Sequence, residues 1–342
     1  MDLKLLEELC CVSGVSGNEN SIRNLLAEKM KDFSPEIDCT GNLVCIKKSK
    51  FKDAPCLMLD AHMDSIGLCI TEICERGFLK FSAVGGVDER ILPATEVLVH
   101  GKKDVFGVVS TKPPHLKDKN DQDTVSIDSL FIDTGENSDG ISIGDKISYA
   151  PKFKKMLNSV SGTYLDNRVG CLAIIDVFMS LNDKELPFDL KAVFSVGEEM
   201  GMKGAKYGQQ VADMGIVLDV TFGKTPDETS DEALEIGGGA AIGVGPNVNK
   251  KISGGLLCCA KDNNINCQVE VLEGCSGTNA WMYQVKGLGI PVGMVSFPIK
   301  YMHTPVETMK ISDYEDCVKL LVDYILGLTG EQISEISGVE IC

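Results

Sequence analysis

Several short apolar runs in this chain end at an acid or a histidine. Residues 56–59, 192–196 and 215–218 are nearly continuous apolar segments, and each is followed within a few residues by side chains that can bind a cation. Short apolar runs rich in β-branched residues predict strands that are buried on both faces, as in the parallel or mixed sheets of α/β proteins. A fourth run, 292–297, leads through a short loop to His303. We therefore expect an α/β fold with a mixed β-sheet flanked by helices.

The segments between these runs show two kinds of sequence pattern. Apolar residues at helical spacing predict helices over 3–11, 20–30, 168–181 and 313–328. Ser16 or Asn18 is expected to cap the second helix. Residues 70–156 show short alternating strands interrupted by Gly, Pro and Asp. We predict a catalytic domain formed by residues 1–69 and 157–342, with an inserted small β-rich domain at 70–156.

The first candidate ligand is His62, which follows the run at 56–59. Residues two apart on an extended segment face the same way, so Asp64 can hold one imidazole nitrogen of His62 while the other nitrogen binds a metal. Glu198 and Glu199 follow the second run after a glycine. A turn there would let one carboxylate bind a metal and leave the other free to act as a general base.

Three further candidates come from separate parts of the chain. Asp166 precedes a predicted helix, Asp219 follows the third run, and His303 follows the fourth. Each has an ordinary alternative; Asp166, for example, could simply cap its helix. Ligands in α/β sheets bind beyond the carboxyl ends of the strands, so these residues are expected to meet there. Two histidines and several acids predict a site for two metal ions.

Composition narrows the function further. The formal net charge of −17 argues against a nucleic-acid partner, because binding to phosphates needs basic surfaces. No segment approaches the roughly 18 to 20 apolar residues of a membrane span, and the N-terminal segment does not resemble a secretory signal. The 14 cysteines are scattered and contain no CxxC pair, so we expect them to be reduced in a cytoplasmic protein.

The chain resembles the M42 family of di-metal aminopeptidases, the glutamyl and leucyl aminopeptidase group that includes the tetrahedral TET peptidases. The resemblance spans nearly the whole length. It is carried by five motifs in the catalytic part, at residues 61–67, 164–170, 196–201, 218–221 and 303–307, and by residues 87–93 and 112–116 in the insert.

This resemblance implies a zinc-peptidase-like catalytic domain and assigns roles to the candidates. His62 and Asp219 would hold one ion, Glu199 and His303 the other, and Asp166 would bridge them. Glu198 would be the general base, Asp64 would orient His62, and the Asp166–Asn167 peptide bond would be cis. Asn279 stands where Asp is common in the family, near the expected substrate pocket. The ions would be Zn, with Co or Mn as alternatives.

The expected reaction is the hydrolysis of the N-terminal residue from short peptides with a free N-terminus. A related di-metal carboxypeptidase or N-deacylase is the alternative among enzymes, and a non-catalytic metal-binding assembly protein is the alternative outside them. The resemblance also implies a homo-oligomer, commonly a dodecamer, assembled through the insert. The preferred N-terminal residue stays open, since an acidic preference needs Lys or Arg in the pocket and an aliphatic one needs an apolar wall.

Overall fold

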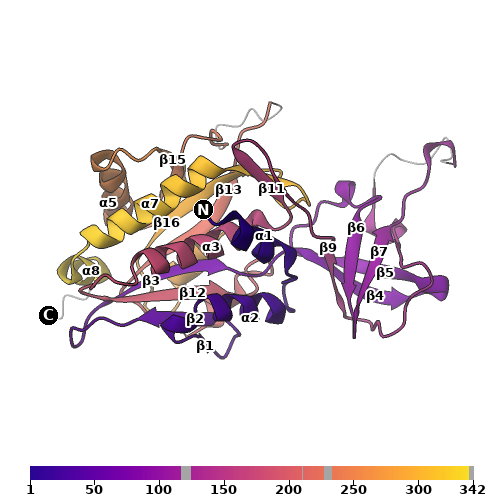
Figure 1. The fold of residues 1–342 in the computed structure, drawn as a ribbon, viewed down its shortest axis with the longest axis horizontal. Helices are drawn as coiled ribbons and strands as arrows, with labels where there is room; N and C mark the ends of the chain where they lie inside the picture. Colours follow the sequence, from indigo (N-terminus) through magenta and orange to yellow (C-terminus); the bar gives the residue numbers. More distant parts are fainter. Residues whose placement is uncertain (117–124, 210, 227–232, 339–342) are drawn as a thin grey trace.

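The computed structural model consists of a large α/β part and a smaller β-barrel that projects from one side of it (Figure 1). It describes residues 1–116, 125–209, 211–226 and 233–338. None of the helices within these ranges has both the length and the apolar character needed to span a membrane. The α/β class predicted from the apolar runs is confirmed.

A mixed eleven-stranded sheet forms the centre of the large part, counted over the described residues. The main order is β1-β2-β12-β3-β13-β16-β17-β11-β10, and β14 pairs with both β15 and β16. In chain order the strands are β1 (Glu36–Ile37), β2 (Leu43–Lys47), β3 (Cys56–His62), β10 (Phe153–Lys155), β11 (Ser159–Gly162), β12 (Asp189–Ser195), β13 (Met214–Phe222), β14 (Ala240–Val244), β15 (Cys267–Val271), β16 (Val292–Lys300) and β17 (Glu307–Lys310). The four central strands β12, β3, β13 and β16 run parallel, so their carboxyl ends meet at one edge.

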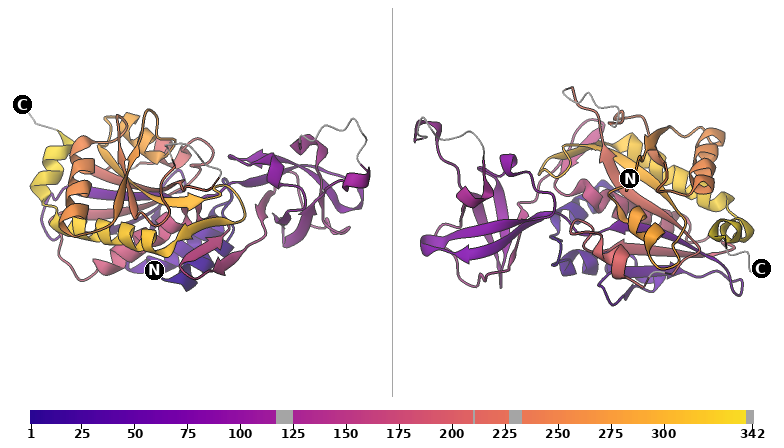
Figure 2. Two further views of the ribbon diagram at one scale, coloured as in Figure 1. Left: turned by 90° about the horizontal axis from the view of Figure 1, so that it is seen from above. Right: turned by 180° about the vertical axis from the view of Figure 1, so that it is seen from behind.

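Helices cover both faces of this sheet (Figures 1 and 2). They are α1 (Leu3–Cys11), α2 (Asn20–Lys29), α3 (Leu165–Ser180), α4 (Lys203–Tyr207), α5 (Lys250–Asp262), α6 (Asn279–Val285), α7 (Ile311–Gly327) and α8 (Gly330–Ser337). Side chains on β3 alternate between the two cores: Leu57 and Leu59 pack in the large core with α1, α3, α5 and α7, whereas Met58 packs in the smaller core with α4 and α6. Because of this alternation, His62 at the end of β3 lies on the same face of the sheet as Met58.

The barrel closes in the order β4-β5-β8-β7-β6-β9. Its strands are β4 (Gly67–Ile73), β5 (Phe78–Val84), β6 (Glu96–His100), β7 (Asp104–Val109), β8 (Ile132–Asp133) and β9 (Lys146–Tyr149). Closure removes the exposed sheet edges that would otherwise invite pairing with other chains. The barrel has its own apolar core, which includes Ile70, Val97 and Ile147.

Two expectations about local structure were wrong. Neither Ser16 nor Asn18 caps α2, since its N-cap residue is Glu19 and no side chain bonds the helix start. The Ser16 hydroxyl is instead committed to the carboxylate of Asp64, at 2.5 Å. The helix predicted to close the chain is followed by α8, which begins with a capping box formed by Thr329 and Gln332.

Candidate metal centre

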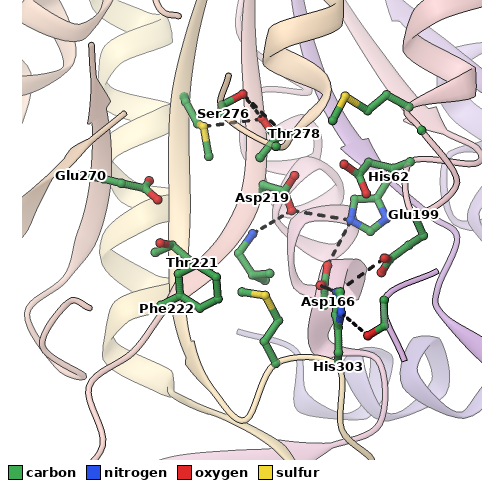
Figure 3. A pocket seen from close by; sticks show the side chains of 18 residues that line it. His62, Asp166, Glu199, Asp219, Thr221, Phe222, Glu270, Ser276, Thr278 and His303 are labelled. Carbon is green, nitrogen blue, oxygen red and sulfur yellow. Dashed lines mark hydrogen bonds and ion pairs between the residues drawn. The ribbon is translucent and has the colours of Figure 1, made fainter. Parts of the chain in front are cut away.

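The carboxyl edge of the parallel strands gathers the predicted ligands. β3 ends at His62, β12 ends two residues before Gly197, and β16 leads through a short loop to His303. Gly197 has a φ of 62°, a left-handed conformation that glycine adopts readily and that turns the chain before Glu198. All five predicted ligands and Glu198 line one cavity (Figure 3).

Asp219 also lies near this edge, although it belongs to the interior of strand β13. The apolar run predicted a strand that stops at Leu218, but β13 continues to Phe222. The pairing of β13 with β3 ends earlier, at Val217 opposite Asp60. Asp219 follows two residues later on the same face of the sheet as Val217, and this is also the face of His62.

The first cluster consists of His62, Asp166 and Asp219. The Nε2 atom of His62 lies 3.1 Å from Asp166 Oδ1 and 3.6 Å from Asp219 Oδ1. All three residues are buried, and one ligand atom from each lies within 4.8 Å of the others. This geometry suits a single cation held by one nitrogen and two oxygens.

The second cluster consists of His303, Asp166 and Glu199. The Nε2 atom of His303 lies 3.3 Å from Asp166 Oδ2 and 3.5 Å from Glu199 Oε2. Asp166 therefore turns one oxygen toward each cluster, as a bridging carboxylate must. The Asp166–Asn167 peptide bond is cis, as the family resemblance implies.

Both histidines are oriented through their other ring nitrogen. His303 Nδ1 lies 2.9 Å from the carbonyl oxygen of Gly86, on the loop that follows β5. His62 Nδ1 lies 3.1 Å from the backbone oxygen of Asp64 and 3.6 Å from its carboxylate. Such partners leave Nε2 free for a metal and hold the ring in place.

Asp64 also holds the turn that carries the two glutamates. Its Oδ1 accepts a hydrogen bond of 3.0 Å from the amide of Glu198, and its Oδ2 accepts one of 3.3 Å from the amide of Glu199. The Ser16 hydroxyl donates to the same carboxylate. One fully buried acid thus connects the histidine of the first cluster to the Glu198–Glu199 turn.

The pKa values reflect the crowding of acids in this cavity. Burial raises the pKa of Glu198 to about 9 and that of Glu199 to about 8, and neighbouring acids add to both shifts. Burial alone would raise the pKa of Asp166, but hydrogen bonds with His303 and His62 hold it well below its usual range. Carboxyl groups that resist ionisation together need added positive charge to become carboxylates.

These residues fit divalent metal ions. The set of two imidazoles and three carboxylates matches the preferences of Zn and of neighbouring transition metals. Asp166 is buried, and its two oxygens face the Nε2 atoms of His62 and His303, which are themselves candidate ligand atoms, so a cation could lie between each pair. A divalent ion in each cluster would supply the missing positive charge.

Some contributors were not singled out from the sequence. The Glu307 carboxylate accepts hydrogen bonds from the backbone amides of Asp166 and His303, at 3.0 and 2.8 Å, and so positions one residue of each cluster. Arg168 is fully buried, and its guanidinium has no hydrogen-bond partner in the described part of the chain. Glu307 does end the motif at residues 303–307, but nothing in that motif alone indicates its bonds to the two amides.

Asn279 lies next to a residue of the cavity wall but does not line the cavity itself. It is buried at the start of α6, where its amide donates to Asp60 Oδ1 at 2.8 Å and to Ser195 Oγ at 2.7 Å. Asp60 lies two residues before His62 on the same face of β3, and it also accepts a hydrogen bond from the hydroxyl of Tyr283 in the smaller core. Having Asn in place of the family's Asp at position 279 therefore changes the hydrogen bonding of Asp60, which lies on the same strand face as His62. The neighbouring Thr278 does line the cavity.

The chain is similar in sequence and in structure to known peptidases. The sequence profile described as M42 glutamyl aminopeptidase matches residues 41–320. A lysyl aminopeptidase of Pyrococcus furiosus is 34% identical, over 94% of this chain and 95% of its own. An aminopeptidase from Desulfurococcus kamchatkensis is 30% identical with a TM-score of 0.91, covering 99% of this chain and 98% of its own. The TET1 peptidase of Pyrococcus horikoshii is 30% identical with a TM-score of 0.84, covering 95% and 99%.

The fold, the paired clusters and these relatives define a metal-dependent aminopeptidase, a hydrolase of peptide bonds. More particularly, the chain belongs to the M42 glutamyl aminopeptidase family.

Proposed function

We propose that the protein removes the N-terminal residue from short peptides with a free N-terminus, using two divalent ions. His62 and Asp219 would hold one ion, Glu199 and His303 would hold the other, and Asp166 would contribute an oxygen to each. The observation that carries this assignment is the orientation of Asp166, whose Oδ1 and Oδ2 lie 3.1 and 3.3 Å from different histidines. Asp64 acts as a positioning residue for His62.

The ligand set favours Zn, with Co or Mn as alternatives, because imidazole and carboxylate ligands suit all three. When bound, such ions polarise a scissile carbonyl and lower the pKa of water. The protein supplies the remaining chemistry through Glu198. This glutamate belongs to neither of the two ligand clusters found among the described residues, yet it lines the cavity that both clusters share.

Glu198 acts as the general base and then as the general acid. Its carboxylate accepts a proton from the attacking water, and the protonated form returns that proton to the leaving amine. Burial raises the pKa of Glu198 in the absence of metal, and cations bound at the two neighbouring clusters would lower it again, so that the carboxylate could accept a proton. The turn at Gly197 and the bonds from the Glu198 and Glu199 amides to Asp64 fix its position.

A pair of variants tests these assignments. Glu198→Gln keeps the shape of the side chain but cannot accept a proton, so we expect turnover of an aminoacyl p-nitroanilide to fall by at least about 100-fold. Elemental analysis should still find two ions per chain. Glu199→Gln is the matched control, and it should lose metal from the second cluster. Activity retained in Glu198→Gln would remove the base assignment.

The alternative enzyme activities can be distinguished by using substrates with free or blocked termini. An aminopeptidase cleaves a free peptide and spares its N-acetylated form, whereas a deacylase needs the acyl group and a carboxypeptidase needs a free C-terminus. We expect cleavage of Leu-Gly-Gly-amide and none of its N-acetyl derivative. A non-catalytic assembly protein would cleave neither after loading with Zn, Co or Mn.

The barrel is our proposed assembly element. Its strands run from Gly67 to Tyr149, close to the predicted insert at 70–156, and Phe106 and Ile143 are exposed apolar side chains within this segment. The TET1 peptidase of Pyrococcus horikoshii assembles into a tetrahedron or a large octahedral shell. We expect a homo-oligomer, with a dodecamer as the specific form, and native mass spectrometry tests this directly; a monomer at micromolar concentration would contradict it.

We also propose a cytoplasmic location. All 13 cysteines in the described ranges are free, and several of them are buried. Thiols in that state suit a reducing compartment. Fractionation of the native host, with the protein found outside the cytoplasmic fraction, would contradict this proposal.

A further inference from the structure

The metal centre occupies only one end of its cavity. The cavity has a volume of about 470 Å³ and extends past Asp219 to Thr221, Phe222 and Glu270. Figure 3 shows the ligands gathered on one side and Glu270 on the opposite side, with its carboxylate directed toward the interior. A peptide whose scissile bond lies at the ligands must place a neighbouring side chain in the remaining space.

The carboxylate of Glu270 is held in place by hydrogen bonds. It lies on β15, next to Gly243 of β14, and its side chain reaches across to β16, where its Oε2 accepts a hydrogen bond of 2.6 Å from Ser296 Oγ. The hydroxyls of Ser296 and Thr221 are hydrogen-bond partners of the carboxylate. Neutral hydroxyls fix its position without supplying positive charge.

The surroundings of Glu270 leave its charge uncompensated. Burial raises the pKa of Glu270, and its hydrogen bonds with Ser296 and Thr221 oppose this shift only in part. Apart from the two histidines of the metal clusters, the described lining residues include no cationic side chain. A cation that entered this end would remove the electrostatic cost of ionising Glu270.

The walls of the cavity include large apolar side chains. Phe222, Met294 and Met302 are among the residues that line it. Such walls suit the methylene stem of a long side chain whose charged end lies further on. A pocket for an acidic residue needs a Lys or Arg, and a pocket for an aliphatic residue would not place a carboxyl group at its end.

We propose that this end of the cavity selects peptides with a basic N-terminal residue. The stem of a Lys or Arg packs against Phe222, Met294 and Met302, and its ammonium or guanidinium group pairs with the Glu270 carboxylate. This inference rests on the proposed aminopeptidase function and names its substrate class. The overall charge of −17 also favours the approach of cationic peptides.

The test compares lysine with norleucine, which has nearly the same stem and no charge. Values of kcat/KM are measured for Lys, Arg, norleucine and Glu p-nitroanilides with the metal-loaded enzyme. We expect a preference for Lys over norleucine, and Glu270→Gln should reduce that ratio by roughly 10- to 100-fold, the worth of a hydrogen-bonded charge pair. Glu273→Gln removes a nearby exposed acid outside the cavity and should leave the ratio unchanged.

Charge reversal adds a second variant. Glu270→Lys should raise the ratio of Glu to Lys turnover, because the pocket then carries a cation. Thermal unfolding is recorded for each variant, since loss of the Ser296 bond alone would lower stability without changing the preference for Lys.

Three results would overturn the inference while leaving the aminopeptidase function intact. They are wild-type cleavage of norleucine as efficiently as Lys, an unchanged Lys-to-norleucine ratio in Glu270→Gln, and an equal loss for every substrate in that variant. The last result would mean that Glu270 binds the common α-amino group or only supports the fold. Failure to cleave any aminoacyl substrate with metal bound would instead contradict the proposed function itself.

Discussion

Replacing Asp64 by Asn tests whether one buried carboxylate couples the metal site to the catalytic turn. Asp64 accepts hydrogen bonds from Ser16 Oγ and from the amides of Glu198 and Glu199, and it faces Nδ1 of His62. Asn has the same shape but keeps only one acceptor oxygen. Its NH₂ group must therefore point at a donor that Asp64 now satisfies.

The structure sets the size of the effect. The two carboxylate oxygens serve different donors, Glu198 N on Oδ1 and both Glu199 N and Ser16 Oγ on Oδ2. Either orientation of the introduced amide therefore leaves at least one partly buried backbone N–H unsatisfied, at a cost of about 1–3 kcal/mol. Loss of a group that orients a ligand histidine typically weakens metal binding or activity about 10- to 100-fold. Converted to free energy, this fold-change falls within the range of about 1–3 kcal/mol given above for the unsatisfied N–H.

The assay measures metal affinity and turnover separately. Asp64→Asn is titrated with Zn in a competition assay against a chelating dye, and kcat/KM is then measured at saturating metal. We expect both to fall about 10- to 100-fold. Ser16→Ala is the matched control, because it removes only the hydroxyl partner and should have a smaller effect on both. Wild-type metal affinity and turnover in Asp64→Asn would refute the coupling.

Two further predictions concern the metal clusters. The first is a substitution beside His303, and the second is a dependence of stability on pH. A Cβ at Gly86 would lie 2.8 Å from His303 Nδ1, so Gly86→Ala should lower affinity for one of the two ions by roughly 10-fold, whereas Gly254→Ala, which meets no neighbouring atom, should leave both ions bound. In the metal-free protein the pKa values of about 9 for Glu198 and about 8 for Glu199 exceed the ordinary 4.5, so the folded state retains protons that the unfolded chain releases. Thermal stability with chelator should therefore fall as the pH rises from about 5 to about 9, and saturating metal should abolish that fall; equal slopes with and without metal would contradict it.

The ends of the parallel strands were predictable from sequence because they depend on local pattern. A short apolar run followed by His62 or by Glu198 gives both the strand and the direction of its carboxyl end. Asp219 lies close to His62 and Asp166, but it does so from inside a strand that continues to Phe222. The boundary was wrong because strand length depends on pairing with β16, which extends along β13 to Phe222.

Other features depended on contacts that no local pattern contains. Ser16 has the chemistry of a helix cap, but a buried carboxylate 48 residues away competes for its hydroxyl. Glu270 lies in a strand that alternates polar and apolar residues, and only the pairing of β15 with β14 brings it to the cavity. By contrast, α8 had a readable signal, since Thr329 and Gln332 have the spacing of a capping box.

The balance of charge links the metal centre to the proposed choice of substrate. The acids that line the described cavity are Asp166, Glu198, Glu199, Asp219 and Glu270. Two divalent ions would offset the three ligand carboxylates together with the general base, and the buried Arg168 lies near enough to Asp64 for the two charges to interact. Glu270 is then the one lining acid without a counter-charge among the described residues. A basic substrate side chain supplies that charge only when bound, so its contribution appears as selectivity between substrates.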